Sequence, residues 1–334
     1  MDFNGKSILI TGGTGSFGKK FIKTVLERNP DVNRIVIYSR DEFKQFMMGN
    51  MPEFKPYLSK LRFFIGDVRD KERLRWAMDG IDYVVHAAAL KQVPACEYNP
   101  FEAIKTNVMG AQNVIDVCLE NNVEKVVALS TDKASSPINL YGATKLCSDK
   151  LFIASNGYRG GRRTRLSVVR YGNVAGSRGS VIPYWQKLVE EGAEFIPVTD
   201  CSMTRFWLKL EQAVEMVLNA FEKMRGGELF VRKIPSMRMP ELAEAIAPHL
   251  PIKEVGIRPG EKIHEQMIST EDARNTLEFD GYYIICPDAS WWAKNSQGIG
   301  GKPVPAGFSY SSGKNTQWLS VEEMQKLIKE LSVD

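Results

Sequence analysis

The 334-residue sequence has few cysteines and histidines, and it has no long apolar segment. Its five cysteines are far apart and form no C-x-x-C pair, so neither a disulfide framework nor a zinc site is encoded. The three histidines are too scattered for a metal cluster, and we expect no metal. A run of about 18 apolar residues is missing, and the N-terminus lacks the apolar region of a signal peptide. These absences predict a cytoplasmic protein without a membrane partner.

An excess of one charge sign is also missing. The chain has 44 Lys and Arg against 40 Asp and Glu, a net charge of +4, which is too small and dispersed for a nucleic-acid surface. The 27 glycines and 16 prolines follow no short period, which excludes collagen-like and low-complexity chains. With 43% apolar and 25% charged residues, the composition is that of a folded globular protein, and the length predicts one large or two medium domains.

The first half of the chain alternates short apolar segments with amphipathic ones. The apolar segments are rich in Val and Ile and too short for helices, so we predict strands at Ser7–Ile10, Arg34–Tyr38, Leu61–Ile65, Tyr83–Ala87, Lys125–Ser130 and Arg165–Arg170. Helical periodicity predicts helices at Phe17–Arg28, Phe101–Asn121, Tyr141–Asn156, Val181–Glu191 and Leu210–Met224. This alternation predicts an α/β fold of the Rossmann type, with a doubly wound parallel sheet.

After about Arg170, frequent prolines cut the chain into short elements. We predict that residues 1–175 form the dinucleotide-binding domain and that segments near 201–230 and 280–290 return to it. Residues 176–200 and 231–334 are expected to form a smaller α/β substrate-binding lobe. Within it, Gly298–Ser312 is a predicted loop, and Ser320–Glu323 resembles a capping box that begins a last helix, to about Leu331.

A glycine-rich turn follows the first predicted strand and begins the first predicted helix. It contains Gly12, Thr14, Gly15, Ser16, Phe17 and Gly18 in a G-x-x-G-x-x-G spacing. Gly12 allows a tight turn, Gly15 allows the backbone to approach a pyrophosphate, and Gly18 permits close helix–strand packing. The helix N-terminus presents free N–H groups to the phosphates. A glycine pattern alone can mark a mere turn, but the strand before it and the helix after it favour a dinucleotide site.

The ends of the following strands supply the other predicted cofactor residues, which are Ser39, Arg40, Asp41, Lys44, Asp67, Val68, Ala87, Ala88 and Ala89. Ser39 and Arg40 can hold a 2′-phosphate, which predicts NADP rather than NAD. Asp41 lies slightly late for the ribose, so a helix cap is an alternative role. Asp67 is placed to contact the adenine. The three alanines allow a close approach of the cofactor, although ordinary helix–sheet packing explains them equally well.

A Tyr-x-x-x-Lys pair, Tyr141 and Lys145, lies on the helix after the fifth predicted strand, so both side chains share one face. An ammonium beside the phenol, with the positive nicotinamide near, predicts a lowered pKa for Tyr141, which would make it a usable base. Thr131, at the tip of the fifth strand, adds a hydroxyl and completes a Thr–Tyr–Lys triad. Ligands of doubly wound sheets bind at this edge. Tyr310 and Lys314 have the same spacing, but they lie in the predicted loop and match by accident.

Longer motifs agree in order along nearly the whole chain: Thr131–Ala134, Pro137–Lys145, Arg170–Val174, Arg178–Pro183, Met203–Trp207 and Arg258–His264. They resemble the nucleotide-sugar dehydratases of the extended short-chain dehydrogenase/reductase superfamily. The retaining members of that family carry Thr-Asp-Glu where this chain has Thr131, Asp132 and Lys133. Membrane-bound relatives share Asp-Lys but typically lack the Tyr. A soluble chain with both Asp132–Lys133 and Tyr141 is most similar to the inverting UDP-N-acetylglucosamine 4,6-dehydratases.

The resemblance implies a lyase that uses tightly bound, recycled NADP and UDP-N-acetylglucosamine. The implied product is UDP-2-acetamido-2,6-dideoxy-L-arabino-hex-4-ulose, formed as the first step of pseudaminic acid synthesis for flagellin glycosylation. In this chemistry Tyr141 would remove the C4 hydroxyl proton, Lys133 the C5 proton, and protonated Asp132 would assist loss of the C6 hydroxyl. The resemblance also implies a homo-oligomer, a dimer or a hexamer.

The predicted substrate-binding residues are Lys91, Tyr141, Asn173, Arg178, Val181, Arg205, Arg258 and Glu261. Arg205 and Arg258 are candidates for the diphosphate because a guanidinium fork matches phosphate oxygens. Three alternatives stay open at this point. The protein could be a UDP-sugar 4-epimerase, which needs the triad alone, or a non-catalytic NADP-sensing protein of the same fold. The Asp132–Lys133 pair could also be an ordinary solvated loop pair.

Overall fold

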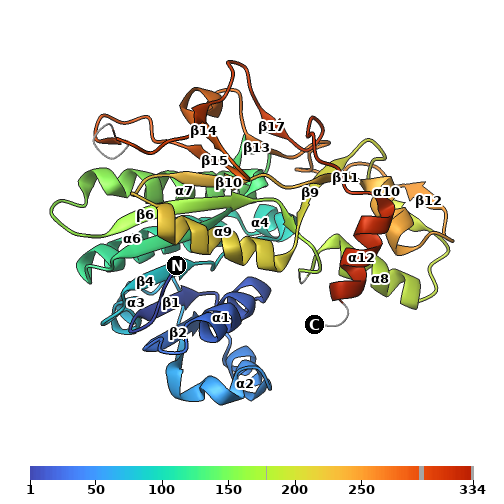
Figure 1. Ribbon diagram of the computed structural model, residues 1–334. Coiled ribbons are helices and arrows are strands. Elements are labelled where there is room, and N and C mark those ends of the chain that lie inside the picture. The colour runs from blue at the N-terminus through green and yellow to red at the C-terminus, as the bar shows by residue number, and fades with distance from the viewer. Residues whose placement is uncertain (178, 293–296, 332–334) are drawn as a thin grey trace.

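The computed structural model describes residues 1–177, 179–292 and 297–331, and its centre is a ten-stranded sheet (Figure 1). The strand order is β16-β14-β15-β10-β6-β5-β4-β1-β2-β3. These strands are β1 (Ser7–Thr11), β2 (Arg34–Ser39), β3 (Leu61–Ile65), β4 (Tyr83–His86), β5 (Lys125–Thr131), β6 (Arg165–Tyr171), β10 (Leu229–Arg232), β14 (Thr276–Phe279), β15 (Tyr282–Ile285) and β16 (Lys302–Pro303). Seven neighbouring strands of this order, β10, β6, β5, β4, β1, β2 and β3, run parallel. The strands β15, β14 and β16 continue the sheet in antiparallel pairing. The predicted Rossmann-type sheet is confirmed.

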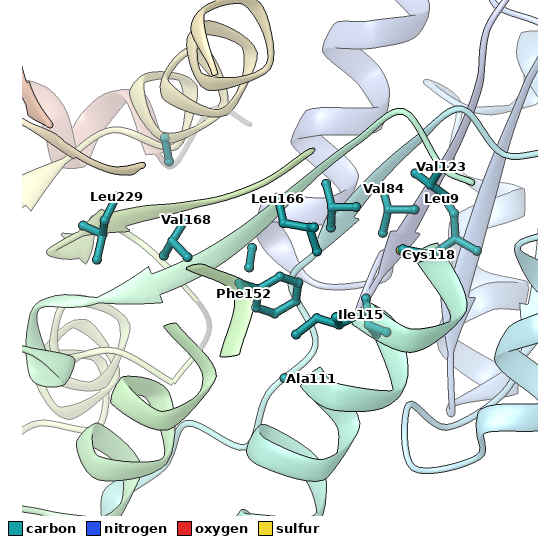
Figure 2. Packing of buried hydrophobic residues seen from close by; sticks show 14 of the residues in the cluster. Leu9, Val84, Ala111, Ile115, Cys118, Val123, Phe152, Leu166, Val168 and Leu229 are labelled. Carbon is teal, nitrogen blue, oxygen red and sulfur yellow. The ribbon is translucent and has the colours of Figure 1, made fainter. Parts of the chain in front are cut away.

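Helices cover both faces of this sheet because the side chains of each strand alternate between them. Leu9 packs on the face covered by α6 and α7, whereas Ile8 and Ile10 pack on the face covered by α1 and α9. Figure 2 shows the first of these two cores, with Phe152 and Ile115 beneath the strands. The helices around the sheet are α1 (Ser16–Arg28), α2 (Glu42–Asn50), α3 (Lys71–Ala77), α4 (Val93–Tyr98), α5 (Pro100–Ile104), α6 (Gly110–Glu120), α7 (Leu140–Tyr158) and α9 (Leu210–Lys223).

Shorter helical turns connect these elements: η1 (Lys55–Lys60), η2 (Lys105–Met109), η3 (Asp132–Ala134) and η4 (Asp272–Asn275). The helix predicted over Phe101–Asn121 is not uniform, because η2 inserts a π-helical turn between α5 and α6. In this turn the amide of Asn107, which is 1% exposed, accepts from the N–H of Leu90 and donates to the carbonyl of Leu90 and to Thr144. The π-turn therefore ties the segment after β4 to α7.

A second lobe lies beside the sheet, at the right of Figure 1. Its elements are β7 (Asn173–Val174), α8 (Val181–Glu190), β8 (Ile196–Val198), β9 (Thr204–Leu208), β11 (Ser236–Arg238), α10 (Met239–Ile246), β12 (Ile252–Glu254) and α12 (Val321–Leu331). The helices enclose their own core around Trp185, Trp207 and Met324. The capping box is confirmed, since Ser320 and Glu323 each accept a hydrogen bond from the other's N–H.

One prediction in this region is wrong. The segment 298–312 is not entirely loop, because β16 pairs with β14, and β17 (Tyr310–Ser311) pairs with β13 (Gln266–Ile268). These pairs are only two residues long on one side, too short to leave a periodic pattern in the sequence. Within the described ranges, no helix is both long and apolar enough to span a membrane.

Candidate active site

A cleft of about 490 Å³ lies where the parallel strands β1, β2, β4, β5 and β6 end. Its wall contains every predicted cofactor residue: Gly12, Thr14, Gly15, Ser16, Phe17, Gly18, Ser39, Arg40, Asp41, Lys44, Asp67, Val68, Ala87, Ala88 and Ala89. Four predicted catalytic residues, Thr131, Lys133, Tyr141 and Lys145, line the same cleft. This convergence follows largely from topology, since most of these residues stand at the carboxyl ends of parallel strands or just after them, whereas Tyr141 and Lys145 come from α7.

The glycine-rich turn fits a dinucleotide in its backbone geometry. Gly12 has φ +69°, and a Cβ there would lie 3.0 Å from the backbone nitrogen of Ala88. A Cβ on Gly18 would lie 2.4 Å from the carbonyl oxygen of Gly13, so only glycine allows α1 to pack this close. Gly15 is the N-cap of α1 and brings no side chain, which leaves the first N–H groups of the helix available to a phosphate.

The tip of β2 has no carboxylate dedicated to a ribose. Asp41 caps α2 by accepting a hydrogen bond from the N–H of Lys44 at 3.0 Å, which confirms the alternative role. Ser39 accepts from Gln45, and the guanidinium of Arg40 is half exposed, 3.6 Å from the carboxylate of Asp67. The tip of β2 therefore presents a long, partly exposed cationic side chain to the cleft.

The catalytic candidates are held at the junction of β5, η3 and α7. Thr131 ends β5; its hydroxyl donates to Asp132 Oδ1 at 3.0 Å and accepts from the N–H of Lys133. Lys133 Nζ donates to the same Asp132 oxygen at 3.1 Å. Gly142, in the first turn of α7, lies very close to η3. A Cβ at this position would be only 2.1 Å from the carbonyl oxygen of Lys133. That approach brings Tyr141 to the same cleft wall as Lys133.

The protein's own groups do not, on balance, lower the pKa of Tyr141, and the predicted lowering also involves the positive nicotinamide. Burial raises the pKa of Tyr141 to about 12, and the charge of Lys133 and a hydrogen bond with Thr131 offset this only in part. The pKa of Lys145 is lowered by burial, against the charge of Asp149, one helical turn further along α7. Among the charges around the phenol, that of Lys133 lowers the pKa of Tyr141 most.

The Asp132–Lys133 pair is not a solvated loop pair, because Asp132 is fully buried. Burial raises the pKa of Asp132, and the positive charge of Lys133 offsets this increase only in part. A Cβ on Gly172 would lie 2.5 Å from Phe206 Cβ and 3.5 Å from Asp132 Oδ2, so that oxygen faces a closely packed wall. Burial also lowers the pKa of Lys133, but two nearby carboxylates outweigh this and raise it above its ordinary value.

The predicted substrate residues are not all brought together. Lys91 and Tyr141 line the cleft, whereas the candidates outside its lining are Asn173, Val181, Arg205, Arg258 and Glu261. Arg205 donates to the backbone carbonyls of Thr204 and Ile263, so much of its guanidinium is used inside the second lobe. Arg258 and Glu261 pair with each other. Arg178 lies outside the described residues.

Sequence reasoning missed one charged residue of the site. Glu265, just before β13, is 2% exposed, and its Oε1 lies 3.4 Å from Lys133 Nζ and 3.8 Å from Arg205 Nε. It directly follows the motif Arg258–His264. A single glutamate carries no spacing signal of its own, and only the tertiary fold brings it to a lysine 132 positions earlier in the chain.

The fold is of the Rossmann type, with its cleft at the carboxyl ends of the parallel strands. A family model described as polysaccharide biosynthesis protein matches residues 8–287. The chain is 57% identical to a UDP-N-acetylglucosamine 4,6-dehydratase (inverting) of Campylobacter jejuni subsp. jejuni serotype O:23/36, over 98% of each chain. It is 42% identical to a UDP-glucose 4-epimerase of Rickettsia typhi, over 98% of this chain and 96% of the relative.

A solved structure, Pen from Bacillus thuringiensis, is similar to the whole molecule. Its TM-score is 0.89 at 37% identity, covering 99% of this chain and 100% of that one. The chain belongs to the polysaccharide biosynthesis protein family. It is an enzyme of the hydro-lyase type.

Proposed function

We propose that the protein catalyses the NADP-dependent 4,6-dehydration of UDP-N-acetylglucosamine with inversion at C5, giving UDP-2-acetamido-2,6-dideoxy-L-arabino-hex-4-ulose. The observation that carries this proposal is the Asp132–Lys133 ion pair, in which Asp132 is buried behind the cleft and Lys133 lines it together with Tyr141. Oxidation at C4 alone needs one base, whereas elimination of water across C5 and C6 needs a second base and an acid. The identity of 57% to an inverting dehydratase supports the same reaction.

The cofactor proposal is supported by the turn around Gly12, Gly15 and Gly18, which would hold the pyrophosphate, and by Ser39 and Arg40, which would hold the 2′-phosphate. Bound NADP supplies a hydride acceptor for C4, a hydride donor for C6 and a positive ring charge. Tyr141, as phenolate, takes the proton of the C4 hydroxyl. Lys133 and the Thr131 hydroxyl favour that phenolate against the effect of burial.

The elimination step uses the second pair of groups. Lys133 is an ammonium in the resting protein, because the carboxylates around it raise its pKa. Its hydrogen bond to Asp132 gives the proton a direct path to a carboxylate whose pKa burial raises. After this transfer, neutral Lys133 takes the proton from C5, which the 4-keto group acidifies. Protonated Asp132 gives its proton to the C6 hydroxyl, which leaves as water.

We further propose that the product enters pseudaminic acid synthesis for flagellin glycosylation, that the protein acts in the cytoplasm, and that it is a homo-oligomer, a dimer or a hexamer. The family resemblance supports these roles, and the five free cysteines agree with a reducing compartment. We also propose that residues 1–175 form the NADP domain, which segments 201–230 and 280–290 join, and that residues 176–200 and 231–334 form the UDP-sugar lobe. The separate core around Trp185 and Met324 supports a second lobe built from 176–200 and part of 231–334.

The decisive experiment is NMR of the product formed from UDP-N-acetylglucosamine in heavy water. We expect a 4-keto sugar with a C6 methyl group, the L-arabino configuration and one deuterium at C5. UDP-N-acetylgalactosamine without deuterium at C5 would instead indicate a 4-epimerase, the activity named for the Rickettsia typhi relative. A 4-keto product with the D-xylo configuration would refute the inversion while preserving the dehydration.

A further inference from the structure

Glu265 lies between two cations at the edge of the catalytic pair. Its Oε1 is 3.4 Å from Lys133 Nζ and 3.8 Å from Arg205 Nε. The side chain is 3% exposed and lies just before β13, whereas Lys133 follows β5 of the central sheet. Lys133 Nζ therefore lies between two carboxylates, Asp132 from its own turn and Glu265 from a segment distant in the sequence.

Burial of this carboxylate is costly for the fold. Among the described residues, Glu265 Oε2 and Asp132 Oδ2 are buried oxygens without a hydrogen-bond partner. Buried ion pairs seldom stabilise a protein more than apolar residues of the same volume, and an unsatisfied buried oxygen adds a penalty. An apolar side chain at this position would stabilise the fold at least as well as the buried carboxylate. We therefore look for a role of the Glu265 charge in the chemistry of the site.

The segment around Glu265 forms hydrogen bonds with the chain just after the catalytic turn, η3 (Asp132–Ala134). Lys262 Nζ donates to the carbonyl of Ser135 at 2.7 Å, and Asn139 Nδ2 donates to the carbonyl of Gly260 at 2.8 Å. The backbone of Glu265 is itself held, since its N–H donates to the hydroxyl of Ser312 and its carbonyl accepts from the N–H of Ser312. Glu265 thus reaches Lys133 from a rigid support.

We propose that Glu265 is a positioning residue that holds Lys133 Nζ against Asp132, so that the pair can exchange the proton which the elimination step requires. Arg205, from β9, holds Glu265 in turn, which gives that buried arginine a role other than diphosphate binding. This inference rests on the proposed dehydratase function. Without Glu265, the long side chain of Lys133 would have other rotamers open to it and would lose its register with Asp132.

The charges around Lys133 agree with this arrangement. Asp132 and Glu265 raise its pKa, and Arg205 lowers it. The charge of Lys133 also acts to lower the pKa values of Lys91, Lys262 and Tyr141. The pKa of Glu265 is lowered because the charges of Lys133, Arg205 and Lys262 outweigh its burial, so Glu265 stays ionised while Asp132, whose pKa is raised, is the better proton acceptor.

The test is Glu265→Gln, compared with wild type in single turnover with UDP-N-acetylglucosamine in heavy water. Oxidation at C4 uses Tyr141 and should keep its rate within about threefold, read from the absorbance of reduced nicotinamide. Deuterium entry at C5 should slow about 100-fold, the cost of a misplacement near 1 Å, so the reduced cofactor accumulates. KM should change little, because Glu265 does not line the cleft.

Two further variants separate positioning from loss of structure. Glu265→Asp keeps the charge but shortens the side chain, and we expect a loss at C5 about tenfold smaller than that of Glu265→Gln. Glu228→Gln removes another buried carboxylate, at the opposite edge of the sheet, where it accepts from Ser167 and two backbone N–H groups. It should lower stability without separating the two steps.

A readout independent of turnover is the pKa of Lys133, followed by NMR of ¹⁵N-lysine protein and assigned by the signal missing in Lys133→Met. It should fall in Glu265→Gln and stay unchanged in Glu228→Gln. The inference is overturned if Glu265→Gln slows both steps equally, slows neither, or is more active than Glu265→Asp. If wild type forms no 4-keto product, the proposed function itself fails, whatever the Glu265 variants do.

Discussion

Gly142→Ala tests whether the contact between α7 and the catalytic turn sets the geometry of the site. An added Cβ would lie 2.1 Å from the carbonyl oxygen of Lys133 and 3.1 Å from Pro137 Cβ. The first neighbour is backbone, which cannot rotate away as the end of a side chain can. To reach an ordinary contact of 3.4 Å, helix and turn must separate by about 1.3 Å.

Two opposing terms set the expected effect on stability. Alanine in place of a helical glycine gains about 1 kcal/mol in helix propensity, whereas overpacking against backbone costs about 1–3 kcal/mol. The net free energy of unfolding should therefore fall by about 0–2 kcal/mol. The effect on rate is larger, because a displacement near 1 Å between Tyr141 and Lys133 costs about 100-fold in kcat.

Urea denaturation measures the first quantity and steady-state product formation the second. Gly49→Ala is the matched control: this helical glycine, in α2, has its closest neighbour, Phe63, at 3.6 Å, an ordinary contact. It should gain about 0.5–1 kcal/mol and keep its kcat. A Gly142→Ala protein that is as stabilised as Gly49→Ala and fully active would refute the argument that this contact positions the site.

Three further predictions concern single side chains. Lys133→Met should abolish deuterium incorporation at C5, whereas Lys314→Met, at an exposed lysine, should not; unchanged incorporation in Lys133→Met would exclude it as the base. Arg40→Ala should weaken binding of NADP about 10- to 100-fold and that of NAD little, measured by calorimetry, since a charge-assisted hydrogen bond contributes about 1.5–3 kcal/mol. Burial lowers the pKa of His86 to about 3, so the unfolded chain binds more protons below about pH 6.5 and stability falls with pH there. In urea titrations at pH 6.5 and 5, His86→Gln should lose about 2 kcal/mol less than wild type; equal losses would contradict this.

The cofactor cleft could be predicted from the sequence because its residues are local. Each group follows one predicted strand, and parallel strands end at one edge, so topology assembles the groups without knowledge of any long-range contact. The π-turn at η2 could not be predicted, because its cause is the buried amide of Asn107, which bonds to the segment after β4 and to α7. Helical periodicity continues across it and hides the insertion.

Arg205 and Glu265 illustrate a different limit. A guanidinium in a shared motif predicts a phosphate ligand, yet the backbone carbonyls of Thr204 and Ile263 and the carboxylate of Glu265 surround Arg205. Which anion an arginine meets depends on how two lobes pack, and neither pattern nor spacing encodes that packing. The same holds for the pKa of Tyr141: the spacing points to Lys145 alone, whereas burial raises this pKa and the charge of Lys133 offsets the increase in part.

The two halves of the proposed chemistry are supported by different parts of the chain. Tyr141 and Lys145 stand on α7, and a helix packed on the central sheet suffices to place them. Lys133 stands on a short turn after β5 and is held through Glu265 by the segment before β13. An enzyme of this fold that only oxidises and reduces C4 needs the first support alone. Changes confined to the segment 260–266 should therefore slow elimination more than they slow oxidation at C4. The contact between this segment and the catalytic turn is thus where dehydration and epimerisation can diverge within one fold.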